Sequence, residues 1–345
     1  MGDRRKASDS IPAVAVFGCG RIGSALDESG SPFVLTHAAA CVKHPGLRLA
    51  ALCDPDPERL AEAGRVRQVT ALYTDAESLL KETPIDVAVI ATPTHLRTSL
   101  ITCALDAGVR TFVLEKPLAT SLEEAEGLAQ LLRAHGATVW VNYLRRYASG
   151  IIEAQQRLTR GELGLPQVAR VLYGKGLNNN GSHAIDLMRW WLGEPSEVSV
   201  LGRVDDDRHD DPTLHLQYAV RQASGAALPV SFHGCDHRAI SVFELDVLCE
   251  RGRLRLAERG DEVRVSMVTD DPVFSGYSAL GPEAVTPGGL NTALAGLWED
   301  VVAVLDGERD APRCTLNDGL AALRIVERTR QASLGEVTPI PDPTR

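Results

Sequence analysis

A glycine-rich turn near the start of the chain constrains the fold more than any other feature. Residues 13–17 form a continuous apolar run, and Gly18-Cys19-Gly20-Arg21-Ile22-Gly23 follows it directly. In a strand–turn–helix unit the first glycine of this pattern allows a tight turn, the second lets a ligand approach the backbone, and the third lets the helix pack closely. Backbone N–H groups at such a helix start favour a diphosphate. The turn therefore predicts a Rossmann-type dinucleotide site formed by Gly18, Gly20, Arg21, Ile22 and Gly23.

An acidic residue at the end of the next apolar run supports this interpretation. Residues 47–53 are apolar and are followed by Asp54, whose carboxylate we expect to hold the ribose hydroxyls of the adenosine. Asp54 lies 31 residues beyond Gly23, against a usual spacing of about 20, so we predict an insertion over 24–36. Because a carboxylate repels a 2′-phosphate, Asp54 favours NAD over NADP.

The periodicity of the chain changes after Tyr143. Before it, apolar runs alternate with amphipathic stretches, which predicts an α/β domain with a parallel sheet covered on both faces. After it, strand-like segments accumulate, which predicts an α+β domain with an open, mainly antiparallel sheet. We expect a Rossmann domain over 11–143 and a second domain over 144–340, whose C-terminal helices can pack back on the first. The expected strands are 14–17, 47–53, 87–91, 111–114, 138–141, 167–173, 197–204, 213–220, 227–233, 241–249, 252–257 and 262–268. The expected helices are 58–63, 96–107, 122–134, 151–159, 290–305 and 317–332.

Composition excludes several classes of partner. The formal charge of -10 disfavours nucleic acid, and no apolar run is long enough to span a membrane. Residues 1–10 are polar and charged, which is typical of a disordered tail rather than a signal peptide. The seven cysteines are scattered without metal-ligand spacing, so we expect free thiols, no metal site and a cytoplasmic location.

Two further motifs follow apolar runs at strand ends, where ligands bind in open α/β sheets. They are Thr92-Pro93-Thr94-His95 and Glu115-Lys116-Pro117. Only five of the 36 basic residues are lysines, so a lysine kept within a motif suggests a need for an ammonium that can lose its proton. An ammonium beside a reacting oxygen stabilises a developing alkoxide and can donate the proton.

In combination, these motifs resemble the oxidoreductase family that groups glucose–fructose oxidoreductase, inositol dehydrogenase and MocA-type proteins. The resemblance runs from Val14 to about Leu334, and Glu-Lys-Pro is the hallmark of that family. It implies NAD(P)-dependent hydride transfer to or from a carbon of a sugar, sugar nucleotide or cyclitol, in a cleft between the two domains. It also implies a homodimer or homotetramer formed through the free face of the second sheet. The cofactor would contact Thr92, Pro93, His95, Glu115 and Lys116, and Lys116 would also reach the substrate.

A motif in the second domain is similar to the substrate-binding segment of the same family. Gly181, His183 and Asp186 match its pattern, but Asn179 stands where the family has an aspartate. Asn can orient a histidine but contributes no charge, so we expect Lys116 to carry more of the proton transfer, with His183 as acid/base or positioning group. The resemblance places Lys175, Asn179 and Asn180 in the substrate pocket. Asp186 is equally well explained as a buried structural acid.

Arg146 resembles an arginine-rich segment near the cleft of the family. It is expected either to contact substrate or cofactor or to form a structural ion pair between the two domains. The charge run 205–211 is expected to be a solvated hairpin tip, and His237 a sheet residue without a carboxylate partner.

Two alternative functions remain open at the level of sequence. One is a dinucleotide-dependent sensor that has lost its chemistry, for which Asn179 is the best indication. The other is a relative that keeps NAD bound and cleaves a glycosidic bond.

Overall fold

The computed structural model describes residues 11–27, 32–222, 225–332 and 334–341. Contacts between residues divide the chain into two units. The first contains the residues up to Tyr147 together with Asn291–Leu320, and the second contains Ala148–Leu290 and the residues from Ala321 onwards. Residues 291–320 therefore make most of their contacts with the first unit, although they follow most of the second in sequence.

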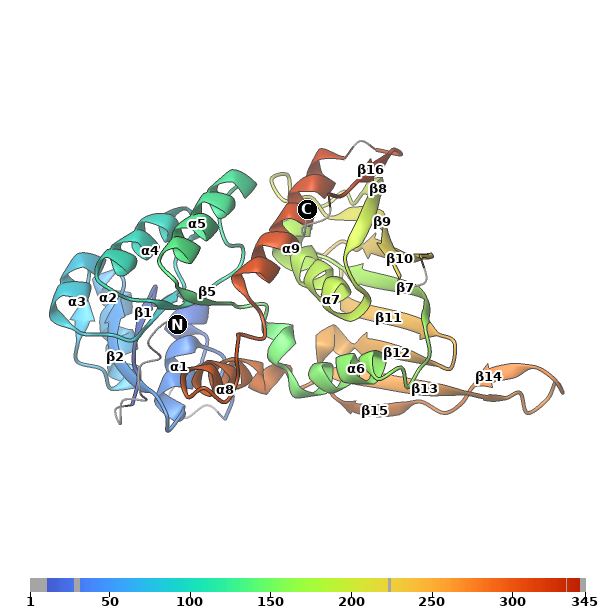
Figure 1. The fold of residues 1–345 in the computed structure, drawn as a ribbon, viewed down its shortest axis with the longest axis horizontal. Coiled ribbons are helices and arrows are strands. Elements are labelled where there is room, and N and C mark those ends of the chain that lie inside the picture. Colours follow the sequence, from blue (N-terminus) through green and yellow to red (C-terminus); the bar gives the residue numbers. More distant parts are fainter. Residues whose placement is uncertain (1–10, 28–31, 223–224, 333, 342–345) are drawn as a thin grey trace. The chain divides into compact units, whose positions relative to one another are not determined.

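The first unit is built on a parallel sheet with the strand order β3-β2-β1-β4-β5-β6. Figure 1 labels β1, β2 and β5 of this sheet. Strands β1 and β4 each begin and end in fully buried residues, because helices cover both faces of the sheet. The order reverses between β1 and β4, and ligands bind beyond the carboxyl ends of strands at such a switch point. The strands are β1 (Ala13–Phe17), β2 (Arg48–Cys53), β3 (Leu72–Tyr73), β4 (Val87–Ile90), β5 (Thr111–Leu114) and β6 (Thr138–Val141).

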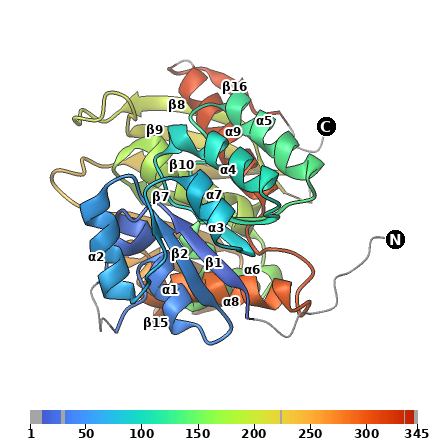
Figure 2. The same ribbon diagram turned by 90° about the vertical axis from the view of Figure 1, so that its left-hand side faces the viewer.

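The helices of the first unit form two layers. Helix α1 packs against α2 and α8, whereas α4 packs against α3 and α5. Figure 2 shows α3, α4 and α5 on one side of β1 and β2, with α1 and α8 on the other. The helices are α1 (His37–Lys43), α2 (Pro57–Arg67), α3 (Ala76–Glu82), α4 (Arg97–Asp106), α5 (Leu122–Ala134) and α8 (Ala293–Leu305).

The start of α5 shows how local sequence sets a helix end. The hydroxyl of Ser121 accepts a hydrogen bond from the N–H of Glu124 (3.1 Å), and the Glu124 carboxylate accepts one from the N–H of Thr120 (2.9 Å). This reciprocal arrangement satisfies N–H groups that have no partner within the helix. The predicted helix 122–134 has these same bounds.

The expected insertion displaces the first helix of the unit. After the glycine-rich turn the chain makes only a short π-helical turn, Arg21–Ala25, and α1 does not begin until His37. Asp27 ties the two ends of the inserted segment 24–36 to each other and to helix α2. Its carboxylate accepts hydrogen bonds from the N–H of Leu35 (3.0 Å) and from Arg67 Nη2 (2.5 Å). Both members of this ion pair are buried. Residues 28–31, including Gly30, lie outside the described residues.

The second unit contains a larger sheet with the order β14-β13-β12-β11-β7-β10-β9-β8-β16, in which β15 also pairs with β13. Strands β7 and β10 run parallel, and the other neighbouring pairs are antiparallel. The expected Rossmann domain followed by a mainly antiparallel sheet is therefore confirmed. The strands are β7 (Pro166–Tyr173), β8 (Pro195–Arg203), β9 (Leu214–Arg221), β10 (Ala227–Gly234), β11 (Phe243–Cys249), β12 (Gly252–Ala257), β13 (Glu262–Asp270), β14 (Ser278–Leu280), β15 (Ala284–Pro287) and β16 (Val337–Pro339).

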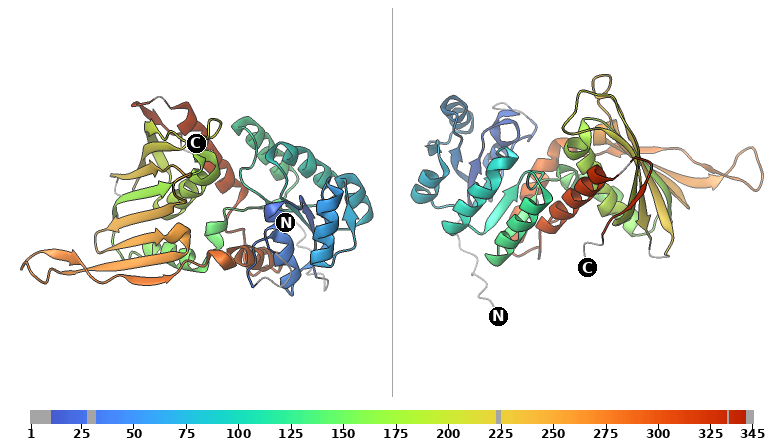
Figure 3. Two further views of the ribbon diagram at one scale, coloured as in Figure 1. Left: turned by 180° about the vertical axis from the view of Figure 1, so that it is seen from behind. Right: turned by 90° about the horizontal axis from the view of Figure 1, so that it is seen from above.

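Helices cover one face of this sheet. Helix α7 (Ser182–Leu192) packs on β7 and on α6 (Ser149–Thr159), and Thr329 of α9 (Leu316–Gln331) bonds to Tyr218 Oη (2.7 Å). Buried residues alternate along β11 and β12 with partly exposed ones, as expected for a sheet with one covered face. The paired strands β13 and β14 extend beyond the neighbouring strands of the sheet (Figure 3).

Candidate functional site

The glycine-rich turn has the geometry that a bound diphosphate requires. Gly18 adopts φ +97°, and a Cβ on Gly23 would lie 1.8 Å from the Gly18 carbonyl oxygen, so neither position accepts a side chain. A Cβ on Gly20 would meet nothing within 4 Å. The space above Gly20 is therefore open, and any side chain there would fill the place that the diphosphate needs.

Asp54 lies directly after β2 and ties this strand to the turn. Its Oδ2 accepts from the N–H of Cys19 (2.8 Å), and its Oδ1 accepts from the N–H of Asp56 (3.0 Å) and from Arg59 Nη1 (3.0 Å). A carboxylate has about four acceptor positions, so Oδ2 keeps one for a ribose hydroxyl. Asp54 is buried, and a cavity of about 440 Å³ adjoins its partners, lined in part by Cys19, Ser24, Asp27, Arg59 and Glu62.

The segment after β4 supplies a buried hydroxyl. Thr92 Oγ1 is shielded from solvent and has no hydrogen-bond partner within the described part of the chain. Such an atom fits a site that a polar ligand completes, because buried polar groups otherwise find partners. Pro93 and His95 follow on the same segment and are exposed.

Arg97, which sequence reasoning missed, joins two of the predicted motifs. Its buried guanidinium donates to the carbonyl oxygens of Thr92, Glu115 and Pro117. Burial lowers the pKa of Arg97, while the Glu115 carboxylate opposes that effect. Arg97 thus fixes the ends of β4 and β5 relative to each other.

Glu115 is buried and holds other side chains. Its Oε1 lies 3.0 Å from His37 Nε2 and accepts from Asn142 Nδ2 (2.6 Å). Burial acts to raise the pKa of Glu115, but His37, Asn142 and Arg97 together hold it below its usual value. The bonds to His37 and Asn142 occupy Oε1 of Glu115. Contact of Glu115 with the cofactor stays a prediction.

Lys116 follows Glu115 at the end of β5 and is half-buried, and the Lys116–Pro117 peptide is cis. Gly18, Asp54, Thr92 and Lys116 follow β1, β2, β4 and β5 in turn. Parallel strands place their carboxyl ends at the same edge, so the first unit gathers these predicted cofactor residues on one edge of its sheet.

The predicted substrate residues of the second unit lie on a second helical turn. Residues Gly176–Gly181 form a π-helical turn that leads into α7, with Lys175 before it at φ +65°. Lys175 and Asn179 are exposed, Asn180 and His183 are half-buried, and Asp186 is buried.

Arg146 forms an ion pair inside the first unit. Its side chain is 4% exposed, and its Nη2 lies 3.2 Å from an Asp318 carboxylate oxygen. Both partners belong to the first unit, so this is not the ion pair between domains that was one of the expected roles, and contact with substrate or cofactor stays a prediction.

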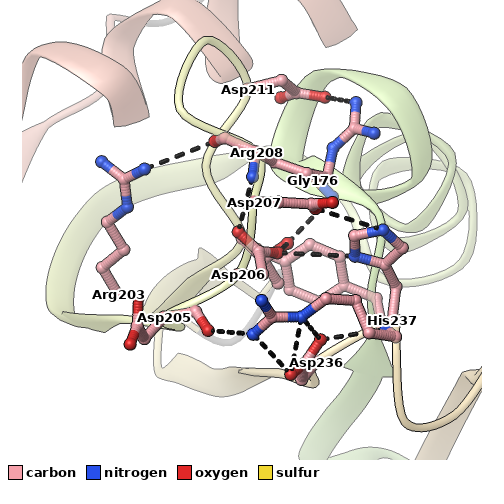
Figure 4. Close-up of polar contacts among 12 residues, drawn as sticks. Gly176, Arg203, Asp205, Asp206, Asp207, Arg208, Asp211, Asp236 and His237 are labelled. Carbon is pink, nitrogen blue, oxygen red and sulfur yellow. Dashed lines mark hydrogen bonds and ion pairs between the residues drawn. The ribbon is translucent and has the colours of Figure 1, made fainter.

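The charge run 205–211 connects the antiparallel strands β8 and β9 and is largely exposed, as expected for a hairpin tip, although Asp206 within it is buried. His237 lies between the carboxylates of Asp206 (Nδ1, 3.8 Å) and Asp207 (Nε2, 3.5 Å), so the expectation that His237 lacks an acidic partner is wrong. Figure 4 shows this cluster, with Arg208 beside Asp211. The loop connects β8 to β9 and folds back over Gly176, a contact between residues far apart in sequence.

The described ranges contain no cluster of three or more His, Cys, Asp or Glu side chains suited to a metal ion. They also contain no helix whose length and apolar character would let it cross a bilayer.

Comparisons with known proteins agree with this geometry. Residues 13–143 match the "Oxidoreductase family, NAD-binding Rossmann fold". The myo-inositol dehydrogenase Hyg17 of Streptomyces leeuwenhoekii is 29% identical, over 88% of this chain and 95% of that protein. The scyllo-inositol 2-dehydrogenase (NAD(+)) of Bacillus subtilis is 29% identical, over 62% of this chain and 64% of that protein.

A solved structure has the same fold. An oxidoreductase from Agrobacterium radiobacter, crystallised with NAD+, L-tartaric acid and magnesium, superposes with a TM-score of 0.76 over 96% of this chain and 99% of that one, at 18% identity. The Rossmann fold expected from the glycine-rich turn is thereby confirmed, and the family match of residues 13–143 supports NAD as the cofactor.

Proposed function

We propose that this chain, whose residues 13–143 match the oxidoreductase family with an NAD-binding Rossmann fold, is a member of that family and an NAD-dependent dehydrogenase of a cyclitol or sugar. One observation carries the proposal. A turn with open space at Gly20, a buried carboxylate at Asp54 and a lysine at Lys116 share one edge of a parallel sheet. The first two bind a dinucleotide, and the third supplies proton chemistry beside it.

Oxidation of a CH–OH group releases a hydride from carbon and a proton from oxygen. A bound NAD would supply the acceptor for the hydride. The ammonium of Lys116 at Nζ stabilises the alkoxide that develops on the substrate oxygen, and a ring nitrogen of His183 takes up or relays the proton. In the reverse direction the same two groups return the proton to the carbonyl oxygen.

The remaining site residues complete the proposal. Lys175, Asn179 and Asn180 bind the hydroxyl groups of the substrate, with Arg146 as a further contact, while Pro93 and His95 adjoin the cofactor. The enzyme acts in the cytoplasm as a homodimer or homotetramer, without a nucleic-acid or membrane partner. The sensor and the glycoside-cleaving enzyme find no support among the relatives compared.

The test is to measure NADH formation from NAD+ with myo-inositol, scyllo-inositol and D-glucose. We expect turnover with at least one of the three. Lys116→Ala should lower kcat by about a hundredfold or more, the range of a general acid–base group. Lys81→Ala, an exposed lysine on α3, is the matched control and should keep the wild-type rate. Full turnover by Lys116→Ala would contradict the mechanism.

A further inference from the structure

The turn Gly176–Gly181 begins on four consecutive backbone N–H groups that all donate to one short segment, residues 211–213. The first N–H groups of a helical turn have no partner inside it, so the group that accepts from them fixes where the turn begins. The bonds are Gly176 N–H to Thr213 Oγ1 (2.9 Å), Leu177 N–H to the Pro212 carbonyl (3.0 Å), Asn178 N–H to Asp211 Oδ1 (2.7 Å) and Asn179 N–H to Asp211 Oδ2 (3.0 Å).

The segment that accepts these bonds is itself anchored. Thr213 donates from Oγ1 to the buried Asp206 (2.7 Å), whose other oxygen accepts from the N–H of Arg208 (3.2 Å). The Arg208 guanidinium lies 3.2 Å from Asp211 Oδ2, as Figure 4 shows. The approach to the turn is close, since a Cβ on Gly176 would lie 2.2 Å from Asp211 Oδ2. Only glycine permits the carboxylate to reach this position.

We propose that Asp211 is a positioning residue of the substrate site, which acts by holding the turn that carries Asn179 and Asn180 and leads to His183. This inference rests on the proposed function. Asp211 touches neither cofactor nor substrate in the proposal; it fixes the backbone from which the substrate-binding side chains project. The loop between β8 and β9 thereby sets the affinity of the enzyme for its polyol.

Residue 179, whose backbone Asp211 holds, is an asparagine. An asparagine there offers no carboxylate to the site, yet the Asp211 carboxylate accepts from the backbone N–H of this same residue. The negative charge beside the turn thus comes from Asp211, in the loop between β8 and β9, and not from residue 179. Hydrogen bonds to a charged acceptor are stronger than neutral ones, so this arrangement holds the turn more firmly than an amide would.

The test compares two substitutions of Asp211 in the full-length enzyme, assayed with NAD+ and the best substrate among myo-inositol, scyllo-inositol and D-glucose. Asp211→Asn keeps one acceptor oxygen and should raise the KM for the polyol about tenfold, whereas Asp211→Leu removes both and should raise it further. The KM for NAD+ should stay within about twofold in both variants, because the cofactor residues belong to the first unit. Asp207→Asn changes a neighbouring exposed carboxylate and should leave both constants unchanged.

The possible outcomes separate a failure of the proposed function from a failure of the role of Asp211. If the wild type oxidises none of the three polyols, the proposed function fails and this inference fails with it. If the wild type is active and Asp211→Asn retains the wild-type KM for polyol, the inference alone is overturned. An equal rise in both KM values would also overturn it, since that pattern indicates general loss of structure. Should Asp211→Leu fail to fold by circular dichroism, Asp211→Asn alone decides.

Discussion

The two oxygens of the Asp54 carboxylate hold different parts of the site. It joins β2 to the glycine-rich turn through Cys19, and it holds Arg59, which is itself half exposed and also paired with Asp56 (2.9 Å). While Asp54 is present, the guanidinium is neutralised and the site repels a 2′-phosphate. Removal of the carboxylate would free Nη1 of Arg59 to donate to a phosphate, while Nη2 keeps its pair with Asp56.

We therefore expect Asp54→Ser to weaken the preference for NAD+. The loss of hydrogen bonds from a charged acceptor should lower kcat/KM with NAD+ by about tenfold or more, while kcat/KM with NADP+ rises or holds. Steady-state kinetics with both cofactors measure the ratio. Glu62→Gln is the control, because Glu62 lines the same cavity but pairs with Arg65 (2.6 Å) rather than with Asp54. An unchanged ratio in Asp54→Ser would refute this role.

The ionisation of Glu115 is expected to make the stability of the fold depend on pH. Its folded pKa lies below the ordinary value of 4.5, so the ionised form stabilises the fold. This contribution is fully present above about pH 4.5 and is lost as the pH falls through the lower folded value. Glu115→Gln should be less stable than the wild type by about 2 kcal/mol near neutral pH, and the gap should narrow on acidification. Urea unfolding across the acid range measures it, with the exposed Glu123→Gln as a variant that should show no gap.

At the scale of elements, the inserted segment depends on one ion pair. Arg67, near the end of α2, donates to the carbonyl oxygens of Ser24 and Asp27 (2.8 Å each) as well as to the Asp27 carboxylate. Because both side chains are buried, removal of one leaves the other charged and unpaired. Such a loss costs about 3–5 kcal/mol, more than replacement of both partners together.

Arg67→Ala should accordingly lower the free energy of unfolding by about 3–5 kcal/mol, and addition of Asp27→Asn should restore part of it. The control stands two residues earlier on the same helix: Arg65 is exposed and pairs with the exposed Glu62, so Arg65→Ala should have no measurable effect. Denaturant unfolding compares the three variants. Equal stability of Arg67→Ala and Arg65→Ala would argue against the pair as the anchor of the insertion.

Elements with strong periodicity could be predicted from the sequence almost to the residue. Helix α5 and strand β12 have the expected bounds, because their apolar spacing and end residues are local signals. Strand β3, with two residues, and the short helices α1 and α3 were not predicted, since seven residues or fewer carry little periodicity. A local signal for α1 existed in Thr36, which caps it by accepting from the N–H of Ala39 (3.2 Å).

The candidate site likewise contains residues that could be predicted from the sequence and contacts that could not. The glycines, Asp54 and Lys116 follow strands directly, so their shared edge could be inferred from strand order. The contact of His37 with Glu115 joins residues 78 positions apart, and Asn179 and Asp211 are 32 apart. Such contacts depend on how whole elements pack, for which one sequence contains no local signal.

At the scale of the whole molecule, we expect copies of the chain to associate through the face of the second sheet that its own helices do not cover. Across β7, β11 and β12, Asp246 accepts from Arg170 (2.9 Å) and from Arg253 (2.8 Å). Burial acts to raise the pKa of Asp246, but the two arginines hold it below its usual value. Val168 and Leu280 line a hollow of about 380 Å³ beside this ladder. The face thus combines apolar contact area with charges already paired within one chain, so a second copy can cover it without an unpaired charge.

We expect the protein to run as a homodimer or homotetramer in size-exclusion chromatography with light scattering, at twice or four times the chain mass. Val168→Glu replaces an apolar contact of the hollow by an additional charge beside the paired charges of Asp246, Arg170 and Arg253, and should shift the population to monomer, because a charge without a partner of its own is costly in an interface. Val42→Glu is the matched control: Val42 is also exposed, at 51%, but lies on α1 of the first unit, so its variant should keep the wild-type mass. A monomeric wild type at micromolar concentration would contradict the assembly, and an unaltered mass for Val168→Glu would place the interface elsewhere on the chain.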